Sequence, residues 1–89
     1  MKKSKSLSIG DLSFKYVPHN PPAIGFIVSK HYGNAVARNL FKRRCRSLFY
    51  NTFIKLGANM AVIIRPNTQN VSYPNIEFAL GSLYEKICV

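Results

Sequence analysis

Apolar and polar residues alternate along one short segment near the start of the chain and give way to an apolar run after it. Leu12, Phe14 and Tyr16 alternate with more polar neighbours, the period-two pattern of a strand with one buried face. The run from Ala23 to Val28 is apolar and rich in β-branched residues, which predicts a buried strand. Pro22 stands between them and cannot donate to a β-ladder. We expect the two segments to form an antiparallel hairpin.

A long helix is predicted next. No glycine or proline occurs from Asn34 to Leu56, Asn34 is a favoured N-cap residue, and Gly57 is typical of the position after a helix. The helix would be about 34 Å long. On a helical wheel, an arc of roughly 100° holds the apolar residues expected to face the core. These residues are Phe41, Cys45, Leu48, Phe49 and Leu56.

The last third of the chain predicts a strand and a second helix. Met60 to Arg65 is apolar almost throughout, so we expect a central strand buried on both faces. Ser72 can cap a final helix with Pro74 in its first turn. One face of that helix carries Ile76, Leu80, Leu83 and Ile87. The order is β-β-α-β-α, an α+β fold in which a long basic helix and a C-terminal helix pack on a small sheet as a two-layer sandwich.

Length and charge refine this outline. The chain has 89 residues, with 13 lysines and arginines against 3 acidic residues, a net charge of +10. We expect a flexible basic N-terminus over residues 1–8 and a single domain over residues 9–89. The charge predicts a polyanionic partner rather than a membrane surface. Polar residues interrupt any signal-peptide core after Met1, so a cytoplasmic location is expected.

Few residues could support chemistry by the protein itself. The acidic residues lie in different segments: Asp11, Glu77 and Glu85. Paired carboxylates that hold Mg²⁺ are the usual protein route to phosphodiester cleavage, and no such pair is visible in the sequence. The cysteines and histidines are also isolated: Cys45, Cys88, His19 and His31. We therefore predict no catalytic residue and no protein-held metal, with both cysteines reduced.

The predicted central helix carries a dense cluster of basic residues, Arg38, Lys42, Arg43, Arg44 and Arg46. Three of them, Arg38, Lys42 and Arg46, form an i, i+4, i+8 line with steps of about 6 Å, which we call the basic row. A simple solvated charge face is the alternative, but such faces mix signs, whereas this helix contains no acid. Like charges at this spacing repel, so a polyanion is the better explanation. Amides at the helix N-terminus add a further anion site.

The segment Lys30-His31-Tyr32-Gly33-Asn34-Ala35-Val36-Ala37-Arg38-Asn39-Leu40-Phe41-Lys42-Arg43-Arg44-Cys45-Arg46 resembles the signature of the bacterial ribonuclease P protein subunit. That family carries a pattern similar to K-K-x-G-N-A-V-x-R-N-R-x-K-R-x-x-R after a strand. The matching residues are Lys30, Gly33, Asn34, Ala35, Val36, Arg38, Asn39, Lys42, Arg43 and Arg46. The resemblance covers residues 12–87 and extends to the preceding strand and the following strand–loop–helix.

Two departures from the family pattern affect function. Leu40 stands where the family has an arginine, and the wheel places it between Arg43 and Arg44. It is interpreted as a lost RNA contact rather than a gained core residue, so Leu40→Arg is expected to raise RNA affinity. The family also begins with an amphipathic helix that walls the leader cleft. Residues 1–11 are too short and too polar to supply it.

The resemblance implies a ribosomal protein S5 domain 2-like fold with a left-handed β-α-β crossover, although about 98% of such units are right-handed. It implies that the chain is the non-catalytic protein subunit of an endoribonuclease. The RNA subunit, with Mg²⁺ held mainly by RNA, would remove the 5′ leader of precursor tRNA. The expected partners are this RNA and precursor tRNA, with no DNA and no membrane.

The resemblance and the wheel together nominate site residues. The RNA-binding set is Arg38, Asn39, Lys42, Arg43 and Arg46, with Arg44 added from the wheel. The candidates for leader or phosphate contact are Lys15, Ser29, Lys30, Tyr32 and Asn34. For Asn34, capping the helix is an equally good interpretation, and Gly33 is expected to serve the turn. Aromatic residues could stack on bases. They are Phe14, Tyr16, Phe26 and Tyr32, although packing in the core is the favoured role of Phe14 and Phe26.

Three other functions stay open from the residues. A small ribosomal or general RNA-binding protein would show the same charge. A helix-turn-helix DNA binder is disfavoured because the basic helix is flanked by strands. A stand-alone nuclease is disfavoured by the scattered acids.

Overall fold

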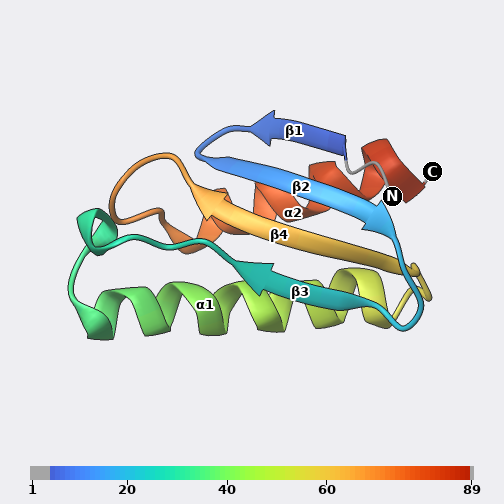
Figure 1. Cartoon of the computed structure of the whole chain (residues 1–89), viewed down its shortest axis with the longest axis horizontal. Coiled ribbons are helices and arrows are strands. Elements are labelled where there is room, and N and C mark those ends of the chain that lie inside the picture. The colour runs from blue at the N-terminus through green and yellow to red at the C-terminus, as the bar shows by residue number, and fades with distance from the viewer. Residues whose placement is uncertain (1–4, 89) are drawn as a thin grey trace.

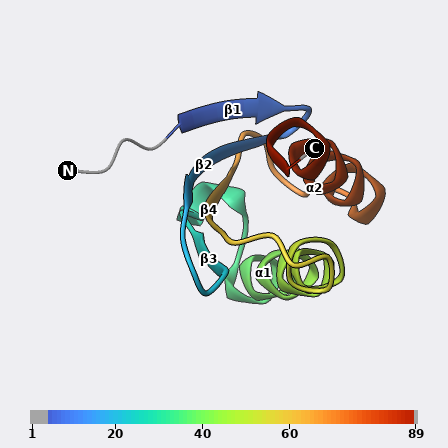
Figure 2. The same cartoon turned by 90° about the vertical axis from the view of Figure 1, so that its right-hand side faces the viewer.

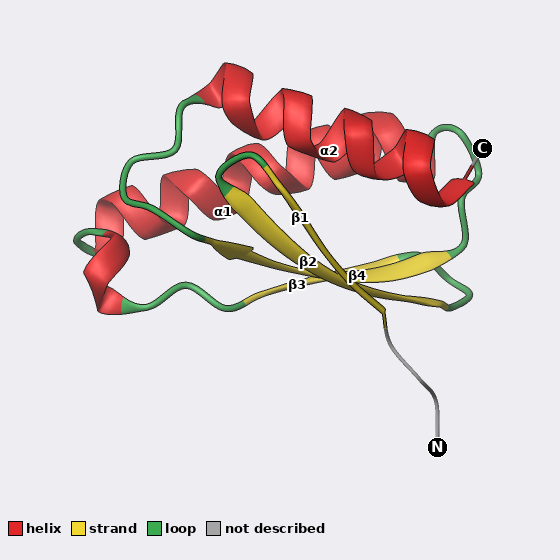
Figure 3. Cartoon of the chain, turned by 90° about the horizontal axis from the view of Figure 1, so that it is seen from above, coloured by secondary structure: helices red, strands yellow, loops and turns green. Residues whose placement is uncertain are grey.

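The computed structural model describes residues 5–88, which form a four-stranded sheet covered on one face by two helices (Figure 1). The elements are β1 (Lys5–Ile9), β2 (Leu12–Pro18), β3 (Ala23–Phe26), a 3₁₀ turn (Lys30–Tyr32), α1 (Ala35–Phe49), a π-helical turn (Tyr50–Ile54), β4 (Met60–Pro66) and α2 (Tyr73–Cys88). Sheet and helices form two layers (Figures 2 and 3), so the predicted α+β sandwich is confirmed.

The strand order is β1-β2-β4-β3. β4 pairs antiparallel with β2 and parallel with β3, so the predicted hairpin between β2 and β3 is wrong. The most apolar strand thereby gains a hydrogen-bonded neighbour on each edge. β3 and β4 are joined through α1, and the views together show that this crossover is left-handed, as the resemblance implies (Figures 1 and 2).

β1 corrects the prediction of a flexible N-terminus for residues 5–8. It pairs antiparallel with β2 through a turn at Gly10 and Asp11, where Gly10 has φ 57°. That backbone conformation is the one glycine adopts most readily in hairpin turns. Leu7 and Ile9 point to the core and give β1 a period-two pattern that its serines and lysine obscure. Residues 1–4 lie outside the described residues.

The sheet has one covered face and one face that no described helix covers, which we call the open face (Figure 2). On β4, Val62 and Ile64 are buried, whereas Ile63 is 41% exposed and Arg65 is also exposed. The prediction that this strand is buried on both faces is therefore wrong. Both helices lie on the same side, which leaves alternate residues of β4 in contact with solvent.

The predicted long helix changes its hydrogen bonding near its end. α1 buries Phe41, Cys45, Leu48 and Phe49 as predicted. Beyond it, Lys55 N donates to Tyr50 O at 2.9 Å and Ala58 N to Phe53 O at 2.8 Å, the five-residue spacing of a π turn. This wider turn rotates the following residues. Phe53 enters the core, and Leu56, predicted to be buried, is 60% exposed.

α2 follows the prediction closely. Ser72 Oγ accepts a hydrogen bond from Asn75 N at 3.4 Å, and Pro74 lies in the first turn. Ile76, Leu80 and Leu83 are fully buried, and Ile87 packs partly against the core. Phe14 of β2 is buried in the same core, as expected.

Candidate nucleic-acid interface

The start of α1 is fixed by two residues of the signature. Asn34 Oδ1 accepts from Ala37 N at 2.9 Å, so the capping role of Asn34 is confirmed. Gly33 has φ 156°, and a Cβ there would lie 3.0 Å from the Ala37 Cβ. That contact is tighter than side chains normally tolerate, so Gly33 serves the turn, as predicted. These two residues set the direction in which α1 and its basic residues leave the sheet.

The basic row lies on the side of α1 nearest the edge strand β3. The Arg46 guanidinium carbon lies 5.3 Å from the centroid of the Phe26 ring on β3, a cation–π contact. Phe26 packs in turn edge-to-face on Phe41, with centroids 6.4 Å apart. Arg38 Nε reaches the carbonyl oxygen of Asn34 at 3.5 Å. Arg38 and Lys42 are half-buried and Arg46 is exposed, and the contact with Phe26 places the Arg46 end of the row at the sheet edge.

The remaining predicted RNA-binding residues face other directions. Arg44 lies on the opposite side of α1, where its guanidinium carbon is 5.7 Å from the centroid of the Tyr73 ring on α2. Arg43 and Asn39 are exposed between these two sides. The five basic residues thus surround the outer half of the helix, and α1 presents positive charge toward both β3 and α2.

Leu40 lies beside Arg44, as the wheel predicts, but its side chain is half-buried rather than free. It lines a hollow of about 170 Å³ between α1 and the loop before α2. Its lining also includes Ala37, Arg44, Asn70, Val71 and Ser72. We call this space the interhelical hollow.

The open face carries the predicted candidate Lys15 in a second depression, which we call the sheet hollow. Its volume is about 350 Å³, and its lining includes Ser6, Ser8, Lys15, Ile27, Ile63 and Arg65. In the strand register Lys15 is opposite Ile63, and Ser13 is opposite Arg65. Two cations therefore flank two exposed isoleucines on this face.

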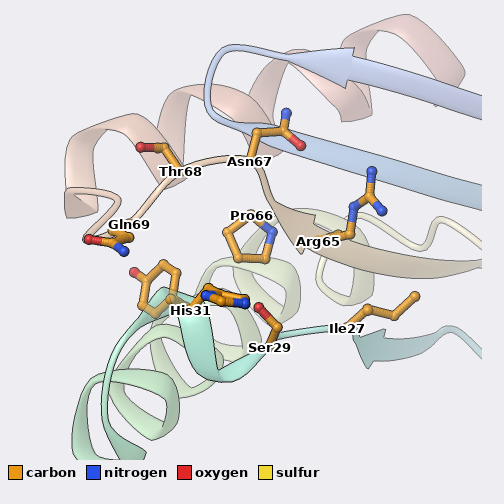
Figure 4. A pocket seen from close by; sticks show the side chains of 9 residues that line it. Ile27, Ser29, His31, Arg65, Pro66, Asn67, Thr68 and Gln69 are labelled. Carbon is orange, nitrogen blue, oxygen red and sulfur yellow. The ribbon is translucent and has the colours of Figure 1, made fainter.

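A third depression of about 390 Å³, the end hollow, continues from the sheet hollow (Figure 4). It lies between the 3₁₀ turn and the loop after β4, and Ile27 and Arg65 line both spaces. Ser29 lines it as a predicted contact residue, together with His31 and Asn67. Ser13 Oγ donates to Asn67 Oδ1 at 2.8 Å, which ties the loop to β2. Lys30 is exposed on the 3₁₀ turn but does not line the hollow.

Tyr32 does not behave as a free contact residue. Its side chain is 7% exposed, and its ring packs on Phe41 with centroids 5.0 Å apart. Its hydroxyl oxygen accepts from Val71 N at 3.1 Å, and burial raises the pKa of the Tyr32 phenol. Tyr32 also lines the end hollow, but its packing and burial leave its ring little surface on which a base could stack. Tyr16, Phe14 and Phe26 also pack on the helix-covered side, so none of them is presented on the open face.

Sequence reasoning missed Arg65, Ile63 and Ile27. Arg65 was treated as the end of a doubly buried strand, yet a charged residue two positions from Ile63 is a signal of an exposed face. Ile27 is 52% exposed just beyond β3, where its N donates to Ile64 O at 3.0 Å. A period-two analysis of β4 that paired Ile63 with Arg65 would have found the open face.

Within residues 5–88, no three His, Cys, Asp or Glu side chains come together in a group that could hold a metal ion. No helix in the same part of the chain is long and apolar enough to span a membrane.

Comparison with known proteins decides the family. A family model described as Ribonuclease P matches residues 1–88. The chain belongs to the ribonuclease P protein family. The ribonuclease P protein component of Acholeplasma laidlawii is 31% identical over 89 residues, which cover 96% of this chain and 77% of that protein. The component of Finegoldia magna is 42% identical over 59 residues, which cover 64% of this chain but only 52%, about half, of that relative.

Solved structures of this family share the fold. The RNase P protein from Thermotoga maritima superimposes with a TM-score of 0.80 at 19% identity, covering 96% of this chain and 84% of that one. The Staphylococcus aureus RNase P protein gives a TM-score of 0.73 at 21% identity, covering 97% and 83% of the two chains. The resemblance noted in the signature is thus confirmed at the level of family and fold.

Proposed function

We propose that this chain is the protein subunit of a ribonuclease P, in which it binds the RNA subunit through α1 and the 5′ leader of precursor tRNA along the open face. The observation that carries the proposal is the position of the basic row beside β3, in a chain of this family. The row borders the sheet edge from which the open face and its cations continue. One RNA-binding surface can therefore extend from the helix onto the sheet.

The chemistry of the open face suits a single strand. Lys15 and Arg65 can neutralise phosphates, while Ile63 and Ile27 offer exposed apolar surface beneath the bases. Single-strand binders combine these two contributions, and both tolerate any base sequence. A leader that differs from one precursor tRNA to the next requires such tolerance.

The proposal assigns hydrolysis to the RNA subunit and its Mg²⁺, acting in the cytoplasm. When bound there, the metal supplies an activated water and neutralises charge at the scissile phosphate. The protein's part is to bind and orient two RNAs and to lower their mutual repulsion. Its net charge of +10 lowers the electrostatic repulsion between the two RNAs.

The open-face part of the proposal is tested by comparing precursor tRNA with leaderless tRNA. The holoenzyme reconstituted with the wild-type chain should bind the precursor more tightly. Lys15→Ala and Arg65→Ala should each reduce this preference severalfold, because each removes one phosphate contact. Lys55→Ala is the matched control, since Lys55 is exposed outside both surfaces. Equal preference in all four proteins would place the leader elsewhere.

A further inference from the structure

The interhelical hollow is separated from the surfaces assigned above. It opens on the α2 side of α1, the side of Arg44, whereas the basic row lies on the β3 side. Its walls are largely apolar, with Leu40, Ala37 and Val71 inside and the polar residues Asn70 and Ser72 along the loop. One helical turn before Leu40, Val36 is 76% exposed and extends the apolar strip.

An aromatic ring and a cation stand at one side of this hollow. Arg44 belongs to its lining and holds its guanidinium over Tyr73, whose side chain is 39% exposed. Unpaired bases stack on aromatic rings and on guanidinium planes. The same guanidinium can contact the adjoining phosphate. The pair therefore presents both groups that a splayed nucleotide needs.

The loop that forms the far wall is held in place before any ligand arrives. Val71 is 4% exposed, and its N–H donates to the buried Tyr32 hydroxyl oxygen. Asn70 has φ 52°, the left-handed conformation that turns the loop toward α2. A wall fixed in this way costs little further ordering on binding, which favours a defined ligand position.

We propose that the interhelical hollow takes an unpaired base of the ribonuclease P RNA subunit, with Arg44 and Tyr73 stacking beside it. The inference rests on the proposed function and extends it to a second contact on the other side of α1. Positive charge selects RNA as the occupant: α1 carries no acidic residue, and Arg43 and Arg44 flank Leu40. Leu40 thereby acquires a role of its own at a position where the family signature has arginine.

Leu40→Arg gives opposite results under the two explanations of this residue, and Leu40→Ala tests the base site without adding charge. If a base occupies the hollow, Leu40→Ala and Leu40→Arg should both weaken binding of the RNA subunit, by about five- to a hundredfold. The salt dependence should not change for Leu40→Ala, because no phosphate contact is lost. If Leu40 is only a missing phosphate contact, Leu40→Arg should raise affinity and steepen the salt dependence. That result would overturn the proposal.

A second set of variants avoids the half-buried position. Tyr73→Ala should weaken binding of the RNA subunit within the same range, whereas Tyr73→Phe should retain the ring and the affinity. Phe78→Ala is the matched control, since Phe78 is a 65% exposed aromatic residue on the same helix that belongs neither to the hollow nor to the Arg44–Tyr73 pair. Equal affinities for Tyr73→Ala and Phe78→Ala, with thermal melts that show both folded, would overturn the proposal.

Failure of the inference and failure of the proposed function give different results. If the wild-type chain does not bind the ribonuclease P RNA subunit, the proposed function fails. If it binds but both Leu40 variants and Tyr73→Ala bind as tightly as wild type, the base site alone is wrong.

Discussion

At the scale of single residues, each cation of α1 has a different neighbour. Arg46 lies over Phe26, Arg44 lies over Tyr73, and Arg43 is exposed. An aromatic ring beneath a guanidinium holds it in position without neutralising its charge. Such an arginine remains available to phosphate and has fewer conformations to lose on binding. The same residue type therefore contributes differently at each position along the helix.

The basic row makes a prediction about salt. Arg38→Ala and Arg46→Ala should each weaken binding to the RNA subunit and reduce the slope of log affinity against log salt by roughly one phosphate. Filter binding over a series of salt concentrations measures both quantities. Lys55→Ala should leave the slope as it is in the wild-type chain. A slope unaffected by both arginine substitutions would mean that this side of α1 does not contact RNA.

Cys45 makes a prediction about reactivity and pH. Burial raises the pKa of the Cys45 thiol to about 12, so it stays protonated at neutral pH. In a Cys88→Ser chain, a thiol reagent at pH 8 should modify Cys45 only after denaturation. Because the unfolded thiol ionises near pH 9 and burial penalises the thiolate, the fold should lose stability as the pH rises from about 9 toward 12. Rapid modification of the native chain would contradict the burial of Cys45.

Some residue roles follow from sequence because they depend on near neighbours. Asn34 accepts a hydrogen bond from the backbone N–H of Ala37, only three residues later, and Gly33 fits a turn formed by its neighbours in sequence. Tyr32 could not be assigned in this way, because its partner Val71 is 39 residues distant. The exposure of Arg65 could be predicted only by knowing which face of β4 the helices cover. Local chemistry was therefore predictable, and roles set by distant contacts were not.

At the scale of elements, the π turn at the end of α1 decides which residues after the helix enter the core. Phe49 and Phe53 stack with centroids 4.8 Å apart, and Phe53 meets Tyr84 edge-on at 5.5 Å. A regular helix would have directed Leu56 toward the core. Wheel analysis assumes a constant period, so it placed Phe49 correctly before the turn and misplaced Leu56 after it. The predicted pairing of β2 with β3 was wrong because it assumed that strands adjacent in sequence pair. β3 pairs instead with β4, which follows the helix.

Because of the π turn, Phe49→Ala and Leu56→Ala should lower the free energy of unfolding by different amounts. Phe49→Ala should reduce the free energy of unfolding by about 3–5 kcal/mol, because it removes a buried ring from the stack. Leu56→Ala should change the free energy of unfolding by no more than about 0.5 kcal/mol, because Leu56 is exposed. Urea denaturation of both variants measures this difference. Comparable losses would indicate that the regular helix, and not the π turn, is present.

At the scale of the whole molecule, the two faces of the sheet differ in what covers them. The helix-covered face of the sheet holds the core, and the open face is the surface that we propose for the leader. α1 belongs to both parts, because one side packs on the sheet and the other sides carry arginines. The α+β order and the location of charge on α1 were predictable from periodicity. The left-handed crossover was not, since generic packing favours the opposite hand.

If this chain assists an RNA that performs the cleavage, as we propose, its effect should appear in the Mg²⁺ dependence of that cleavage. Precursor tRNA is incubated with the cognate ribonuclease P RNA subunit over a Mg²⁺ series, with and without the chain. We expect the chain to lower the Mg²⁺ concentration needed for half-maximal cleavage, because its positive charge replaces part of the screening that Mg²⁺ provides. The chain alone should leave the precursor intact. An unchanged Mg²⁺ requirement in the presence of the folded chain would contradict an assisting role for the protein.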